Sequence, residues 1–171
     1  MTTAAATKSK TWLIDHETDS GIVFIRSAEA REPDPADWKS RMIRAIQRHP
    51  RVGLVGAKRL AADGTVHSMG EFLVHPKGFH HTGTGERGIS YRFPQEVDAI
   101  CSGVAAVSKA IFDEVHGEDL CRGELGLVAL SLAIREAGYR VLAIPSVCLC
   151  DETTPCPDDA EESAFHNHHY F

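Results

Sequence analysis

The stretch Val52-Gly-Leu-Val-Gly56, followed by Lys58-Arg59-Leu60 and then by Ala62-Asp63-Gly64, decides the fold. Its short apolar run, rich in β-branched residues, predicts a buried strand. Asp-Gly between apolar alternations is a strong signal for a hairpin turn, and residues 65–74 alternate loosely beyond it. We therefore expect a buried strand that turns back on itself through an antiparallel hairpin.

Further strands and helices flank this segment. Apolar runs predict strands at residues 21–25, 96–107 and 141–149, and helical spacing predicts helices at 34–48, 108–116 and 124–137. Asp34 followed by Pro35 is typical of a helix start. The pattern predicts an α/β fold, in which helices flank a mixed β-sheet.

The remaining segments are expected to be tails and a loop. Residues 1–20 predict a flexible N-terminal tail, and residues 151–171 an acidic and then His-rich, aromatic C-terminal tail. Residues 75–91 are rich in Gly, His and Thr without periodicity, which predicts a long loop. A single domain is thus expected over residues 21–150.

Composition excludes several classes of function. The chain has 18 basic and 24 acidic side chains and a formal net charge of −6, which argues against nucleic-acid binding. No apolar run approaches the ~20 residues that a membrane span needs. The five cysteines are an odd number in a chain for which we expect no export signal, and they predict reduced thiols and a cytoplasmic protein.

Three stretches resemble the family-2 glycosyltransferases, which use the GT-A fold. The stretches are residues 48–70, 96–115 and 133–145, and their order and spacing extend the resemblance over about residues 21–150. In that family a nucleotide-binding half of roughly a hundred residues precedes the first of them, whereas about twenty residues do so here. The resemblance therefore implies a truncated GT-A-like domain that matches the later half only.

The first acidic motif of that family is degenerate in this sequence. The family places two aspartates, one residue apart, after the strand that matches residues 21–25, where they hold the Mn²⁺ or Mg²⁺ that neutralises the nucleotide diphosphate. Arg26-Ser27-Ala28-Glu29 occupies this place. Arg26 and Glu29 are thus the candidate residues on the nucleotide or metal side, and we expect a divalent cation only in an active enzyme.

The second acidic motif is degenerate as well. The family's acidic pair, one member of which is the general base, matches Leu127 and Ala129. Glu124 lies one turn upstream and is the remaining candidate for a catalytic residue, although a glutamate at a helix N-terminus also interacts favourably with the helix dipole. His80 and His81, in the expected loop, are candidate ligand contacts.

Loss of both acidic motifs leads to the first functional hypothesis. It is a catalytically impaired glycosyltransferase-like domain that acts as a binding or scaffolding module in a carbohydrate-modifying protein or complex. Helix 124–137 is apolar almost all round, which predicts that another domain, another chain or a second copy covers it. Carbohydrate is a further expected ligand.

Two alternatives stay open. One is an active, metal-independent transferase using a nucleotide-sugar donor, in which Arg26 or the loop histidines stabilise the diphosphate. The other is a small metal-binding protein, whose ligands would be Cys148, Cys150, Cys156, His166, His168 and His169. Their spacing matches none of the usual zinc patterns. Cys101-Ser102-Gly103 suggests a nucleophile, but the sequence places no histidine or acid beside it, so packing at a strand end is the preferred interpretation.

Overall fold

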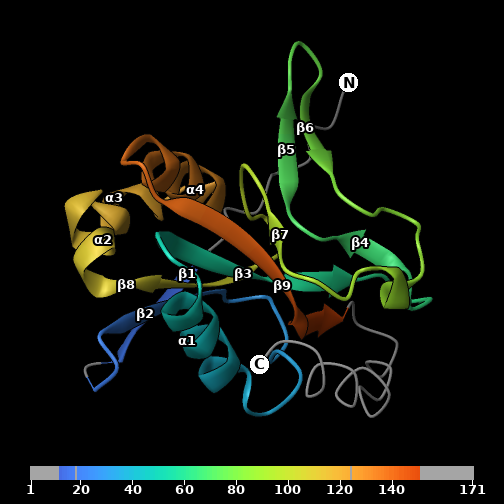
Figure 1. Ribbon diagram of the computed structural model, residues 1–171, viewed down its shortest axis with the longest axis horizontal. Coiled ribbons are helices and arrows are strands. Elements are labelled where there is room, and N and C mark those ends of the chain that lie inside the picture. Colours follow the sequence, from blue (N-terminus) through green and yellow to red (C-terminus); the bar gives the residue numbers. More distant parts are fainter. Residues whose placement is uncertain (1–11, 18, 124, 151–171) are drawn as a thin grey trace, which may run out of the picture.

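The structure is a computed structural model that describes residues 12–17, 19–123 and 125–150 (Figure 1). The strands are β1 (Trp12–Glu17), β2 (Ile22–Ser27), β3 (Val52–Leu60), β4 (Val66–Ser68), β5 (Glu71–Val74), β6 (Gly78–His81), β7 (Gln95–Glu96), β8 (Val104–Ser108) and β9 (Arg140–Cys150). The helices are α1 (Trp38–Arg48), α2 (Lys109–Glu114), α3 (Gly117–Leu120) and α4 (Gly126–Glu136), with a 3₁₀ turn η1 (Gly88–Ser90).

Seven strands form one mixed sheet, which confirms the predicted α/β class. Its order is β1-β2-β8-β3-β9-β7, with β4 paired to β3. The β3–β9 pair is parallel and the other pairs are antiparallel. β3 is therefore central, because β8 lies on one side of it and β9 on the other.

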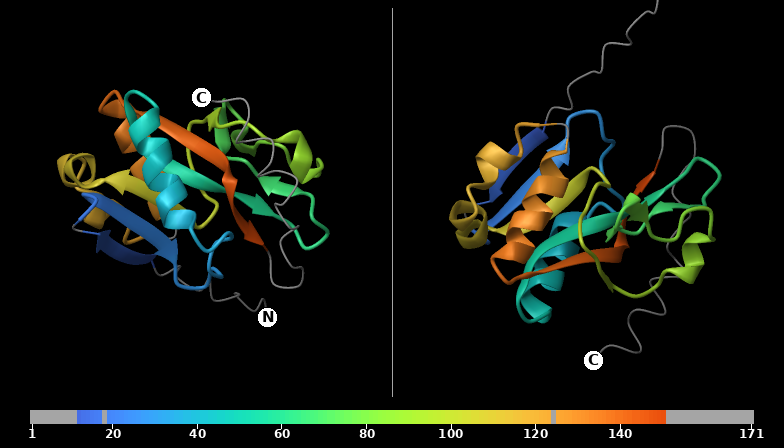
Figure 2. Two further views of the ribbon diagram at one scale, coloured as in Figure 1. Left: turned by 60° about the horizontal axis from the view of Figure 1, so that its bottom comes forward. Right: turned by 90° about the horizontal axis from the view of Figure 1, so that it is seen from above.

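Helices cover both faces of the sheet (Figure 2). On one face Trp38 and Met42 of α1 pack into a core cluster with Val55, and on the other Leu130 of α4 packs into a cluster with Leu54. Leu54 and Val55 serve opposite faces because successive side chains of a strand alternate. This explains why β3 is apolar throughout its first residues.

The predicted Asp-Gly hairpin is confirmed between β3 and β4. Asp63 Oδ1 accepts hydrogen bonds from the backbone N–H of Thr65 at 2.9 Å and from its hydroxyl at 2.6 Å. These bonds favour the carboxylate and lower the pKa of Asp63 below its usual range. Gly64 has φ +80°, which a glycine adopts without strain.

Two elements start or end elsewhere than predicted. The helix predicted to begin at Asp34 begins at Trp38, because the backbone of Asp34 forms an isolated antiparallel bridge with Cys148 on β9. The strand predicted over residues 96–107 is divided into β7 and β8. Between them, Gly103 has φ +100° and the backbone of Ala99 bridges to Glu71.

The expected tail and loop contain regular structure. Residues 12–17 of the predicted N-terminal tail form β1, whose backbone pairs antiparallel with β2 and whose side chains are half-buried or exposed. The predicted loop over residues 75–91 contains β6 and η1. β6 pairs with β5 in a hairpin that stands out from the body of the molecule (Figure 1).

Two further expectations concern the surface of α4 and the cysteines. Most apolar side chains of α4 are covered by the chain's own core, and Leu132 is the large one on the helix that stays exposed. Leu125, just before the helix and inside the predicted range, is 66% exposed, so a partner over this helix stays a prediction that rests on a smaller apolar surface than the sequence suggests. Cys150 is disulfide-bonded, so the expectation of reduced thiols fails there, while Cys101, Cys121 and Cys148 keep their thiols outside any disulfide. In the described part of the chain, no helix is both long and apolar enough to cross a membrane.

Candidate functional site

The end of β2 carries a cation in place of paired carboxylates. Arg26 forms an ion pair with Glu32 at 3.0 Å and donates a hydrogen bond from Nη1 to the carbonyl of Ala30 at 3.3 Å. Ser27, the next residue, is buried, and its N–H donates to the carbonyl of Gly103. Glu29 is exposed on the following turn. One exposed carboxylate beside a guanidinium is a poor site for a divalent cation.

The start of α4 carries no acid at the two positions that the sequence resemblance aligns with the family's acidic pair. Leu127 is buried in the hydrophobic core, and Ala129 is half-buried. Glu124, the predicted catalytic candidate, lies outside the described residues. Four of the residues predicted as zinc ligands also lie outside the described residues, namely Cys156, His166, His168 and His169.

The two candidate histidines lie on opposite faces of β6. The register of the hairpin places His81 opposite Glu71 and His80 opposite Phe72. His80 is exposed, whereas His81 points towards the base of the hairpin and contacts Glu71. Only one of the two predicted contacts thus belongs to a cluster of polar side chains.

Three neighbouring backbone segments build that cluster. β6 pairs with β5 on one side, and Ala99 bridges to Glu71 on the other, through a hydrogen bond from the Glu71 N–H to the Ala99 carbonyl at 2.9 Å. Cys101 lies two residues after Ala99, and side chains two residues apart in an extended segment point to the same face. The side chain of Cys101 therefore lies on the same face as that of Ala99. Glu71 consequently lies between His81 and Cys101.

The side chains converge on one carboxylate oxygen. Glu71 Oε1 accepts a hydrogen bond from Ser68 Oγ at 2.6 Å and lies 3.1 Å from His81 Nδ1 and 2.7 Å from Cys101 Sγ. Cys101 Sγ and His81 Nδ1 are themselves 3.7 Å apart. We call Glu71, His81 and Cys101 the base cluster, since they lie at the base of the β5–β6 hairpin.

The burial of the base cluster is uneven. Glu71 is 1% exposed, and its second oxygen, Oε2, is buried without a hydrogen-bond partner. The side chain of His81 is 43% exposed, and Cys101 is half-buried. Buried carboxylate oxygens are normally satisfied, so an orphaned one needs an explanation.

A second set of contacts fixes the hairpin to α4. Asp98 accepts a hydrogen bond from the backbone N–H of Leu73 at 2.8 Å and forms an ion pair with Arg135. Arg135 also donates to the carbonyl of Val97 at 2.9 Å. The hairpin is therefore fixed to the body of the molecule by the hydrogen bond from Leu73 to Asp98 as well as by the contacts of the base cluster.

The order of contacts decides between two kinds of chemistry. A cysteine nucleophile needs histidine between the thiol and the acid, so that each ring nitrogen serves one neighbour. Here Cys101 and Glu71 both approach Nδ1 of His81 and also contact each other directly. The three groups surround one point, as ligands of a shared ion do, and do not form a relay.

Sequence reasoning found His81 and missed Glu71. The sequence places no histidine or acid beside Cys101, whereas the structure places His81 and Glu71 there. The cluster depends on the pairing of residues 71 and 81 across the hairpin, and residues 75–91, which lack alternation, give no signal of this pairing. A surface pocket elsewhere, at α2 and α3, is lined by Phe112, Asp113, His116, Gly117, Glu118 and Asp119, none of them a predicted site residue.

Comparison of the chain with protein-family models, with curated proteins and with solved structures finds no match. The resemblance described above consequently rests on the three sequence stretches that carry it.

Proposed function

We propose that this chain is a glycosyltransferase-like domain without catalytic activity, which acts as a binding or scaffolding module in a carbohydrate-modifying protein or complex. One observation carries the proposal. Where the resembled family holds a cation with two carboxylates, the cation present is the guanidinium of Arg26, already neutralised by Glu32 at 3.0 Å. A divalent metal ion would meet a positive charge there instead of the pair of carboxylate ligands that it needs.

The helix that would supply the general base supports the same proposal. Leu127 is 1% exposed, so the position of an acidic side chain is occupied by an apolar core residue. Returning an acid to this buried position would leave a charge without a partner. Loss of the base is thus built into the core packing, which fits a domain that no longer needs catalysis.

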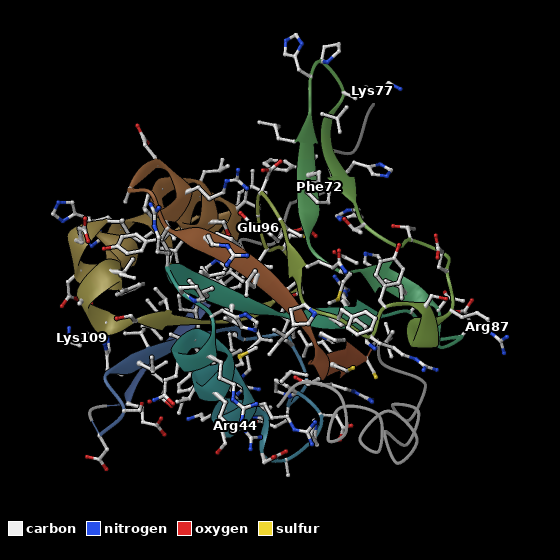
Figure 3. All side chains as sticks on the ribbon, in the orientation of Figure 1. Arg44, Phe72, Lys77, Arg87, Glu96 and Lys109 are labelled. Carbon is white, nitrogen blue, oxygen red and sulfur yellow. The ribbon has the colours of Figure 1, made fainter. Side chains whose placement is uncertain are left out.

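The β5–β6 hairpin supports a binding role. Each strand of this hairpin has four residues, and four of its large apolar side chains are exposed: Phe72, Leu73, Val74 and Phe79. Figure 3 shows Phe72 and Lys77 on the part that projects from the body. Contiguous apolar side chains on a projecting element are typical of protein–protein contacts.

Calorimetric titration with UDP and UDP-sugars, with and without Mn²⁺, tests the loss of catalysis. We expect no binding heat in either condition. Saturable binding that depends on Mn²⁺ would contradict the proposal and would direct attention to Glu29 and Glu124.

A hairpin variant tests the binding role. Extract from cells that make the protein is passed over the wild-type chain, over Phe72→Ser/Phe79→Ser, and over the control Leu13→Ser, which changes an exposed leucine on β1. We expect a protein that binds the wild type and the control and not the hairpin variant. Equal binding to all three would remove the hairpin from the proposal.

A metal-independent transferase is the second candidate, and Arg26 is the observation in its favour. For this role the guanidinium would have to exchange Glu32 and the Ala30 carbonyl for a diphosphate. Binding of UDP without metal that is lost in Arg26→Ala and kept in Arg44→Ala would favour it. Arg44 is a matched control because it is an exposed arginine on α1 that also has a carboxylate partner, Asp37.

A further inference from the structure

We propose that the base cluster, Glu71, His81 and Cys101, is a binding site for a divalent transition metal ion, and that Zn²⁺ is the ion it fits best. The site lies at the hairpin and uses none of the residues on which the proposed function rests. Either proposal can therefore fail without the other.

The distances between the three ligand atoms suit a small tetrahedral ion. Zn²⁺ bonds of about 2.3 Å to sulfur and 2.0–2.1 Å to nitrogen and oxygen place neighbouring ligand atoms roughly 3.3–3.6 Å apart. The Cys101–His81 pair, at 3.7 Å, and the His81–Glu71 pair, at 3.1 Å, are close to these separations. The Cys101–Glu71 separation, at 2.7 Å, is shorter because the thiol donates a hydrogen bond to the carboxylate. When an ion binds, the thiol would lose its proton and the two atoms would move apart.

The orphaned oxygen of Glu71 is the second and independent observation. Oε1 interacts with Ser68, His81 and Cys101, whereas Oε2 is buried without a partner on a side chain that is 1% exposed. Burying a carboxylate in this way costs free energy unless something compensates it. A bound cation would supply that compensation.

The donor set selects the class of ion. Thiolate, imidazole and carboxylate are each ligands of Zn²⁺, whereas Mg²⁺ and Ca²⁺ prefer oxygen ligands alone. Ser68, which is fully buried, donates to the ligating carboxylate and orients it, as outer-shell partners of metal ligands do. The exposed side of His81 leaves room for a solvent ligand, which is a feature of open zinc sites.

Titration of the full-length, reduced chain with Zn²⁺ and Co²⁺ tests the proposal. We expect one tightly bound ion and, with Co²⁺, a thiolate-to-metal charge-transfer absorption that reports the Cys101 ligand. Cys101→Ser should abolish this absorption, and His81→Ala should weaken Zn²⁺ binding by at least about tenfold, since losing a ligand costs no less than losing an outer-shell partner.

Three controls keep the result unambiguous. His80→Ala changes the neighbouring residue on the opposite face of β6 and should bind as the wild type does. A variant with Cys156→Ser, His166→Ala, His168→Ala and His169→Ala removes the alternative ligands of the C-terminal segment and should also bind normally. His81 is exposed enough for its alanine variant to fold, which far-ultraviolet circular dichroism verifies.

Three outcomes would overturn the proposal. They are the absence of saturable binding to the wild type, unchanged affinity in both Cys101→Ser and His81→Ala, and loss of binding in the C-terminal variant alone. Failure here would leave the proposed function untouched, because nucleotide-sugar binding is measured separately.

Discussion

The end of β2 and the base cluster both place charged or polar side chains beside the sheet. The two regions differ in how far along the chain the partners of these side chains lie. Arg26 finds its partners, Ala30 and Glu32, within six residues of its own position. Glu71 draws its neighbours from three segments, with His81 ten and Cys101 thirty residues away. The first region is complete within one loop, and the second exists only when the hairpin has docked.

This difference indicates where a ligand is needed. The Arg26–Glu32 pair is partly exposed, and solvent supplies whatever the pair leaves unsatisfied. Glu71 is buried, and its Oε2 is shielded from solvent and has no hydrogen-bond partner. A buried group that is assembled from distant segments and left incomplete is a better indication of a site than an exposed charge in a familiar motif position.

The largest expected effect comes from Gly70, which precedes Glu71. Its φ is +82°, and a Cβ would lie 2.6 Å from Val97, so Gly70→Ala should lower the free energy of unfolding by about 2–4 kcal/mol. The matched control is Gly78→Ala, with φ +85° and no atom within 4 Å of the added Cβ, for which the cost should be ~1 kcal/mol. Chemical denaturation measures both. Equal costs would mean that the base of the hairpin is not tightly packed.

Excess Zn²⁺ gives the next largest effect. At a hundredfold excess over its dissociation constant, an ion that binds only the folded chain should raise the free energy of unfolding by about 2.7 kcal/mol. The gain should vanish in Cys101→Ser and persist in Arg26→Ala, as followed by thermal unfolding with and without the ion. A gain that was lost in Arg26→Ala and kept in Cys101→Ser would mean that the ion binds at the end of β2 and not at the base cluster.

How far these regions could be predicted depends on the range of their contacts. The strand around Val52–Gly56 and the turn at Asp63–Gly64 were predicted correctly, since both depend on local patterns. Glu71 was missed because its environment depends on the register of β5 against β6 and on a bridge to Ala99. No local pattern in the sequence encodes either of them.

The same reasoning explains the misplaced helix start. Asp34 and Pro35 form a good capping signal, but the backbone of Asp34 is paired with Cys148, more than a hundred residues away. Tertiary pairing therefore overrode a local preference, and the helix began at Trp38.

A smaller effect is expected at the end of β2. Because the side chains of Arg26 and Glu32 are 30% and 65% exposed, their ion pair should contribute only about 0.2–1 kcal/mol. A double-mutant cycle with Arg26→Ala and Glu32→Ala measures this coupling. A coupling well above 1 kcal/mol would mean that the region is a structural anchor and not a solvated loop.

The smallest effect at neutral pH is that of the ionisation of Cys121, a buried thiol that serves as a contrast to Cys101, because it appears only in alkaline solution. Burial raises the pKa of Cys121 from 9.0 to about 11. Between these two values the unfolded chain loses its thiol proton before the folded chain does, so the free energy of unfolding should fall as the pH rises from 9 to 11. Cys121→Ala should show a shallower fall in denaturation experiments over this range, and an identical slope would contradict the assignment.

The position of β3 at the centre of the sheet has a consequence for biosynthesis. Val55 pairs with Ala106 on one side and with Leu142 on the other, so its neighbours are synthesised roughly 50 and 90 residues after it. At translation rates of about 5–20 residues per second, an apolar strand with open edges waits several seconds on the nascent chain before its second neighbour emerges. During that interval the chain is a substrate for chaperones that bind extended apolar segments, and its yield should depend on them more than its final stability would suggest.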